Sequence, residues 1–204
     1  MSIRVEFKLT FIHINQNAGT SVTRFLNDNF HCSWSGQIHD TYAVQRPKWQ
    51  RNPFAVVRNT YDRLVSLYEH DRTVFASDDN DFYREESRLL EKGFDHYVKH
   101  CQHHRFNKER NKAGSRRMTW AEQTQLRFLP ADLKEIKLIK FDNLEEELYA
   151  LLKQNGLVHK KPIERLNQTP TRTTRDYRKY YTEETKEIVD RIFAREIKTF
   201  KFKF

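Results

Sequence analysis

The chain has 204 residues and a mass of 24.8 kDa, a length typical of one domain with its own core, so a single domain over residues 1–204 is predicted. Its 37 Lys and Arg residues exceed its 28 Asp and Glu residues, and the net charge of +9 favours an anionic partner such as a nucleotide, an acidic polysaccharide or a nucleic acid. Fifteen Phe and nine Tyr residues argue against disorder, two Cys residues exclude a disulfide framework, and no apolar run could cross a bilayer, so a soluble, cytoplasmic protein without a membrane partner is expected.

Two strand–loop–helix units are predicted in the first 70 residues. Apolar and polar residues alternate from Ile3 to Phe11 before the run becomes wholly apolar, which predicts one strand entering the middle of a sheet. A helix follows, with Val22, Phe25, Leu26 and Phe30 at helical spacing, and then a loop over residues 31–40. The second unit has a strand over Phe54–Val57 and a helix marked by Tyr61, Leu64, Val65 and Tyr68. This repetition predicts an α/β fold with a central parallel sheet, whose ligands bind at the carboxyl ends of the strands.

The loop of the first unit has the composition of a phosphate cradle. It runs through small and polar residues, Asn17, Ala18, Gly19, Thr20 and Ser21, directly into the helix. Loop N–H groups and a helix N-terminus together favour an anion, and Gly19 permits close approach of the backbone. The loop is not a Walker A motif, because no Gly lies four or five residues before Gly19 and no Lys lies beside it.

The loop of the second unit begins with a cation. Arg58 follows the buried strand directly, and Ser66 lies eight residues further on, about two helical turns into the next helix. A guanidinium suits a phosphate dianion, and a hydroxyl can complete the contact. Arg58 and Ser66 are therefore predicted to bind a phosphate together.

The region from about residue 71 to 119 is polar and is interpreted as a variable insertion. Its acidic residues near position 80 lack the Gly and the distal Glu of an EF-hand. His96 and His100 share a helix face, which raises a metal hypothesis, but the H-E-x-x-H motif and a second Cys pair are absent. Exposed imidazoles are favoured, and no metal is expected. The basic run over residues 105–117 leaves two interpretations open, a solvated loop or a lid that grips an acidic acceptor.

The last third of the chain adds one more strand and two helices. A strand is predicted over residues 136–141, and a helix over Glu145–Gln154 that ends at Asn155-Gly156. Thr182 is the expected N-cap of the final helix, which should bury Ile188, Val189, Ile192, Phe193 and Ile197. Phe200, Phe202 and Phe204 alternate as a short terminal strand.

Several of these segments resemble the sulfotransferases that use 3′-phosphoadenosine 5′-phosphosulfate (PAPS). FIHINQNAGTS at residues 11–21 resembles the 5′-phosphosulfate loop F-I-H-I-P-K-T-A-G-T-S, and FAVVRNTYDRLVSLY at 54–68 resembles the 3′-phosphate segment R-N-P-Y-D-R-L-V-S-x-Y. WAEQTQLRFL at 120–129 is similar to the family's Q-x-x-y-L, and LNQT at 166–169 to its h-l-N-x-s loop. The resemblance is strongest to the carbohydrate branch that includes heparan sulfate 2-O-sulfotransferase. It implies a P-loop-like, three-layer α/β/α domain.

The resemblance also implies a function and a set of roles. The reaction would be in-line transfer of a sulfuryl group from PAPS to an acceptor hydroxyl, which the net charge suggests is on an acidic saccharide, leaving 3′-phosphoadenosine 5′-phosphate (PAP). Loop residues 17–21 would hold the 5′-phosphosulfate, and Arg58 with Ser66 the 3′-phosphate. His39, in GQIHDTY, would be the general base, and His13 would shape the site.

The main departure from the family pattern is Gln16, which replaces a Lys that contacts the leaving group. An amide can donate a hydrogen bond but carries no charge. Arg172 and Arg175, which follow the LNQT segment, are also predicted to bind a phosphate or sulfate of the nucleotide. Three outcomes stay open: another cation such as Arg172, Arg175 or a Lys of the basic run substitutes, the enzyme is slow, or the chain is a nucleotide- or glycan-binding module without turnover. A nucleic-acid-binding protein is a further rival, although no helix-turn-helix, RNP-like or zinc-finger motif is visible and no nucleic-acid partner is expected. A nucleotide kinase is disfavoured, because the Walker Lys is absent.

Overall fold

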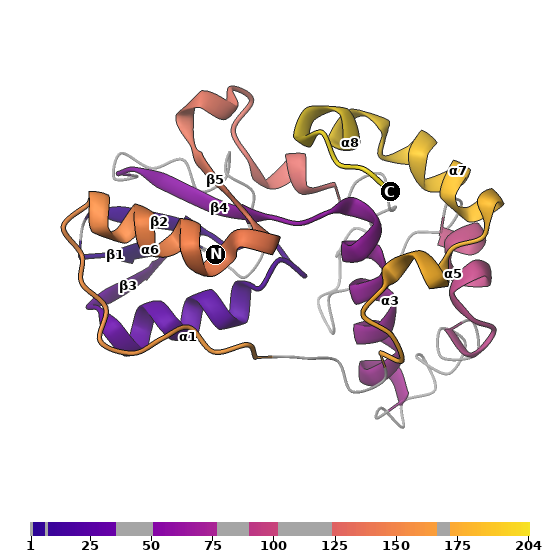
Figure 1. The fold of residues 1–204 in the computed structure, drawn as a ribbon, viewed down its shortest axis with the longest axis horizontal. Helices are drawn as coiled ribbons and strands as arrows, with labels where there is room; N and C mark the ends of the chain where they lie inside the picture. Colours follow the sequence, from indigo (N-terminus) through magenta and orange to yellow (C-terminus); the bar gives the residue numbers. More distant parts are fainter. Residues whose placement is uncertain (1, 7, 36–50, 77–89, 102–123, 167–171) are drawn as a thin grey trace, which may run out of the picture. The chain divides into compact units, whose positions relative to one another are not determined.

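The computed structural model describes residues 2–6, 8–35, 51–76, 90–101, 124–166 and 172–204 (Figure 1). The chain divides into two compact units, which are described one at a time. Unit 1 comprises residues 1–58 and 125–168, and unit 2 comprises residues 59–124 and 169–204. Both units are discontinuous in sequence.

Unit 1 contains a five-stranded sheet with the strand order β3-β1-β2-β4-β5. Its strands are β1 (Ser2–Val5), β2 (Leu9–Ile12), β3 (Cys32–Ser35), β4 (Pro53–Val57) and β5 (Lys137–Lys140). The predicted α/β class is confirmed, and β2, β4 and β5 are parallel as expected. The sheet as a whole is mixed, however, because β1 pairs antiparallel with both β2 and β3.

The strand predicted from Ile3 through residue 12 is a hairpin instead. Val5 pairs with Leu9, and Lys8 N–H donates to the Val5 carbonyl at 2.8 Å. Glu6 adopts a left-handed backbone with a φ of 49°. The two antiparallel strands carry the same alternating pattern as one long strand, so periodicity alone could not reveal the turn. The loop predicted after the first helix likewise begins with an unforeseen strand, β3.

One face of this sheet is covered by helices α1 (Gly19–Asn29) and α6 (Leu144–Gln154), which Figure 1 shows beside the strands. Phe11 and Phe54 are register partners, and their rings lie 5.1 Å apart on this face. The face and the helices form one core: Ile3, Val5, Leu9, Phe11, Val22, Phe25, Leu26, Phe54, Val56, Ile139, Leu148, Leu151 and Leu152. Both helices were predicted, and α6 ends as expected, with Gly156 at a φ of 64° and Leu157 N–H donating to the Leu152 carbonyl at 2.9 Å.

The described residues of unit 1 also include the 3-10 helices η2 (Gln125–Phe128), η3 (Leu133–Glu135) and η4 (Phe141–Asn143). The predicted strand over 136–141 is shorter than expected, because its last residue, Phe141, belongs to η4.

Unit 2 packs α3 (Thr60–Ala76), α5 (Phe94–Cys101), α7 (Glu183–Ile192) and α8 (Ala194–Phe200), with the 3-10 helix η5 (Tyr177–Tyr180). Its core is rich in aromatic side chains: Tyr61, Leu64, Val65, Tyr68, Leu90, Phe94, Tyr97, Val98, Ile188, Val189 and Phe193. Thr182 caps α7 as predicted, and its hydroxyl accepts from Thr185 N–H at 3.2 Å.

The C-terminal prediction is partly wrong. The expected single helix breaks at Phe193, which ends α7 and caps α8. Residues 200–204 form no strand, because α8 extends to Phe200 and Lys201 ends it in a left-handed conformation with a φ of 56°. The buried carboxylate of Glu196 in α8 accepts hydrogen bonds from the hydroxyls of Thr60 and Thr124.

Within the described ranges, no helix has the length and apolar character that crossing a membrane requires.

Candidate functional site

The loop between β2 and α1 has a special backbone. Gln16 and Ala18 both adopt the left-handed conformation, with φ values of 62° and 57°. For a residue other than Gly this conformation costs on the order of 1 kcal/mol. Such outliers concentrate at functional sites, so they support the prediction that this loop is a site. The first bond of α1 runs from Val22 N–H to the Ala18 carbonyl at 3.0 Å, which leaves the N–H groups of residues 19–21 without an acceptor in their own helix.

Gly19 lets this loop pack tightly against His13. A Cβ atom added at Gly19 would lie 1.8 Å from His13 Nε2, far inside van der Waals contact. The requirement for Gly at this position is therefore steric and comes from the imidazole of a residue six positions earlier in the chain. The same packing withdraws the ring from water, and burial lowers the pKa of His13 from 6.5 to about 4.

Two predicted phosphate-binding side chains of the loop have protein partners. Asn17 is 1% exposed, and its Nδ2 donates to the Val56 carbonyl at 2.7 Å and to Gln125 Oε1 at 2.6 Å. Ser21 is buried, and its hydroxyl accepts from Leu166 N–H at 2.9 Å. Leu166 opens the LNQT segment, so this bond attaches the start of that segment to α1. Thr20 is exposed.

Arg58 reaches the loop, as the strand-end argument predicts. Its Nη1 donates to the Gln16 carbonyl at 3.0 Å, and the guanidinium carbon lies 4.3 Å from the centre of the Phe141 ring. Arg58 is 8% exposed. The aromatic face and the carbonyl fix the planar group, and such a cation–π contact contributes on the order of 0.5–2 kcal/mol.

Gln125 is a residue of this site whose role sequence reasoning missed. It is fully buried at the start of η2, and it bonds to both main-chain groups of Arg58: Oε1 accepts from Arg58 N–H, and Nε2 donates to the Arg58 carbonyl, each at 2.9 Å. Only its place in the WAEQTQLRFL segment could have drawn attention to it. Phe141 was also missed, because it was predicted as the end of a strand.

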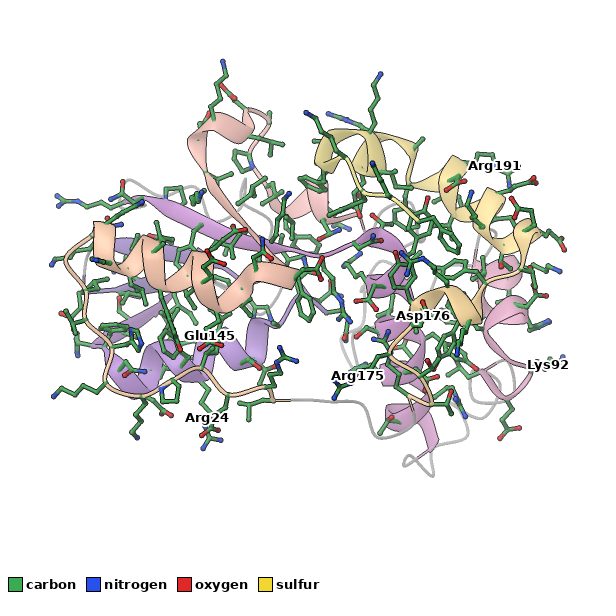
Figure 2. All side chains as sticks on the ribbon, viewed as in Figure 1. Arg24, Lys92, Glu145, Arg175, Asp176 and Arg191 are labelled. Atoms are coloured by element: carbon green, nitrogen blue, oxygen red, sulfur yellow. The ribbon has the colours of Figure 1, made fainter. Side chains whose placement is uncertain are left out.

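Three other predicted residues lie in unit 2. Ser66 is buried on α3. Arg172 donates from Nη2 to Asp62 Oδ1 at 2.7 Å and from Nε to the Thr174 carbonyl at 2.9 Å, so much of its hydrogen-bonding capacity is used within the unit. Arg175 is exposed just before η5 (Figure 2). A joint phosphate site of Arg58 and Ser66 stays a prediction.

The predicted base, His39, lies outside the described residues, as does the basic run over 105–117. His96 and His100 do share a face of α5, with ring centres 6.0 Å apart. In the described part of the chain, no three His, Cys, Asp or Glu side chains are grouped as a metal site would require.

Within unit 1 the described side chains suit the binding of an anion. A helix N-terminus, a loop with two left-handed residues and the Arg58 guanidinium meet at the carboxyl ends of β2 and β4. His13 is neutral near pH 7, but its low pKa makes it a weak proton acceptor, which supports the structural role predicted for it.

The contact between Gly19 and His13 predicts a specific pattern of stability. Gly19→Ala should lower the free energy of unfolding by about 1–3 kcal/mol, because the new methyl group overlaps the imidazole. In a His13→Ala background the same substitution should cost far less. Urea unfolding of the four proteins of this double-mutant cycle measures the coupling, and additive effects would contradict the steric explanation.

The depressed pKa of His13 predicts a pH dependence of stability. The unfolded chain binds a proton near pH 6.5 and the folded chain near pH 4, so His13 stabilises the fold above pH 6.5 and loses this contribution as the pH falls toward 4. His13→Gln should flatten the stability profile between pH 4 and 6.5. NMR titration of the imidazole provides the direct check, and a midpoint near 6.5 in the folded protein would contradict the burial argument.

Comparison of the chain with protein-family models, with curated proteins and with solved structures found no match.

Proposed function

We propose that this protein is a PAPS-dependent sulfotransferase that acts on an acceptor hydroxyl. The observation that carries the proposal is the hydrogen bond between Arg58 Nη1 and the Gln16 carbonyl. The two segments that resemble the family's 5′- and 3′-phosphate motifs are 42 residues apart at these positions, yet they meet at one edge of the sheet. A nucleotide with phosphates on both its 5′ and 3′ positions needs two such anion sites close together.

In this proposal the 5′-phosphosulfate lies against the N-terminus of α1 and the loop before it. Arg58 receives the 3′-phosphate. The proposed class is the three-layer, P-loop-like one, with β2, β4 and β5 as its parallel strands. The left-handed residues Gln16 and Ala18 support this arrangement, because strained backbone of this kind concentrates in binding and catalytic loops.

The proposed reaction is an in-line displacement at sulfur. The acceptor oxygen forms a bond to sulfur while the bond from sulfur to the bridging phosphate oxygen breaks, and PAP leaves. His39 takes the hydroxyl proton. The protein contributes mainly by positioning the two oxygens and by stabilising charge on the transferred group. The net charge of +9 favours an acidic saccharide as the acceptor.

A second candidate function is nucleotide binding without efficient transfer. The observation in its favour is the neutral Gln16 at the position where the resemblance calls for Lys. Arg172, one of the possible substitutes, is already paired with Asp62 at 2.7 Å. Loss of a charge-assisted contact to the leaving group costs on the order of 1.5–3 kcal/mol, which corresponds to roughly a tenfold to hundredfold loss of rate.

Nucleotide binding tests the first part of the proposal. PAP should bind the wild-type protein with micromolar affinity, and Arg58→Gln should weaken binding at least tenfold, because a neutral amide cannot neutralise a phosphate. Calorimetric titration at low salt measures both affinities. Arg24→Gln is the matched control, since it removes the same charge from an exposed position of α1 (Figure 2). Failure of PAP to bind the wild-type protein would overturn the proposal.

Restoring the missing charge tests catalysis. Gln16→Lys should raise the release of PAP from radiolabelled PAPS about tenfold or more in the presence of acidic polysaccharides. Both residues have a Cβ, so the substitution adds no new restriction at the φ of 62°. Gln154→Lys, at an exposed position on α6, is the control for added charge. If PAP binds but neither protein transfers sulfate to any acidic polysaccharide tested, the binding-module alternative is favoured.

A further inference from the structure

Arg58 lies where the sheet stops providing partners for the main chain. The last register pair between β4 and β5 is Val57 with Lys140, one residue before Arg58. A buried N–H and C=O beyond the end of a ladder need other partners. Gln125 supplies both from a single amide, with Oε1 accepting from Arg58 N–H and Nε2 donating to the Arg58 carbonyl. The side chain thus continues the strand pairing by one residue.

The same amide also fixes the β2–α1 loop. Gln125 Oε1 accepts a second bond, from Asn17 Nδ2, at 2.6 Å. Asn17 Nδ2 also donates to the Val56 carbonyl on β4. The loop and residue 58 are therefore joined twice, once through Gln125 and once by the bond from Arg58 to the Gln16 carbonyl.

We propose that Gln125 is a positioning residue that sets the distance between the β2–α1 loop and the Arg58 guanidinium, and so the spacing of the two phosphate sites. This inference rests on the proposed function. Gln125 acts through Asn17 and Arg58 and does not touch the nucleotide. The role requires an amide, because one atom must accept two bonds while its neighbour donates one.

Gln125→Glu tests this requirement, because its pH dependence separates positioning from general damage. An ionised Glu can accept from Asn17 and Arg58 but cannot donate to the Arg58 carbonyl. A protonated Glu has the donor and the acceptors of the native amide, and burial raises the pKa of a carboxyl group. Relative to wild type at each pH, the variant should bind PAP at least tenfold more weakly at pH 8.5 and recover to within about threefold at pH 5.5.

The comparison with wild type at each pH cancels titration of the nucleotide phosphates. Of the side chains on the segments bonded to Gln125, the Arg58 guanidinium stays charged over this range, and His13, with a pKa of about 4, stays neutral. Gln154→Glu introduces the same change at an exposed position of α6 and should match wild type at both pH values. Gln125→Met, which is uncharged and of similar size, should bind weakly at both pH values. In the protein without nucleotide, protection of the Arg58 N–H from hydrogen exchange should rank the wild type and the variants in the same order as their affinities for PAP.

The outcomes separate the two proposals. If the wild-type protein does not bind PAP, the proposed function fails. The positioning role of Gln125 is then tested only by the hydrogen-exchange protection of the Arg58 N–H in the variants and in wild type. If wild type binds PAP but Gln125→Glu binds equally well at pH 8.5, or equally poorly at both pH values, the positioning role is overturned. Unchanged binding by Gln125→Met would overturn it as well.

Discussion

The parallel pairing of β2 with β4 is the constraint on which the rest of the site depends. Neighbouring parallel strands end at the same edge of a sheet, so the loop after β2 and the residue after β4 become neighbours regardless of the chain between them. Antiparallel pairing would have sent these segments to opposite edges. This pairing places the β2–α1 loop beside the end of β4. The other features of the site are local to that edge of the sheet: the left-handed turn at Gln16, the bond from Arg58 to the loop and the bonds of the Gln125 amide.

Buried polar groups give the site its rigidity. Asn17, Gln125 and the main chain of Arg58 form a connected network in which most donors and acceptors are used within protein. Within the residues described, Asn17 Oδ1 is a buried acceptor of this group without a hydrogen-bond partner. A network of this kind defines one arrangement sharply, because any displacement leaves several buried groups unsatisfied at once.

Sequence patterns predicted those features of the chain that are local. The helical spacing of Val22, Phe25 and Leu26 located α1, and Thr182 and Gly156 marked a helix start and a helix end, because capping chemistry acts within a few residues. The turn at Glu6 was missed, since a hairpin and a long strand share the same alternation. The break at Phe193 was missed because the apolar spacing continues across it.

In the candidate site, too, the local features could be predicted from the sequence and the long-range contacts could not. The sequence predicted that Arg58 lies near the loop, because both follow strands of a parallel sheet. That prediction required only the order of two strands and their helices along the chain. The partners of Asn17 and the role of Gln125 depend on contacts between residues that are 39 to 108 positions apart in the chain, and no rule of local spacing predicts such contacts. The steric demand of His13 on Gly19 could not be predicted either, because a Gly at the start of a helix is compatible both with a phosphate-binding loop and with close packing of a ring.

The discontinuity of unit 1 has a consequence for the order of folding. Strand β4 can pair with β5 only after residues 137–140 are available, and the bond from Asn17 to Gln125 closes a still longer loop. Contacts between such distant segments carry a large entropic cost before they become favourable, so they form late. During synthesis the β1–β2 hairpin and α1 can form early, whereas the hydrogen bonds from Gln125 to Asn17 and Arg58 must wait until more than 60% of the chain has emerged, since Gln125 is residue 125 of 204.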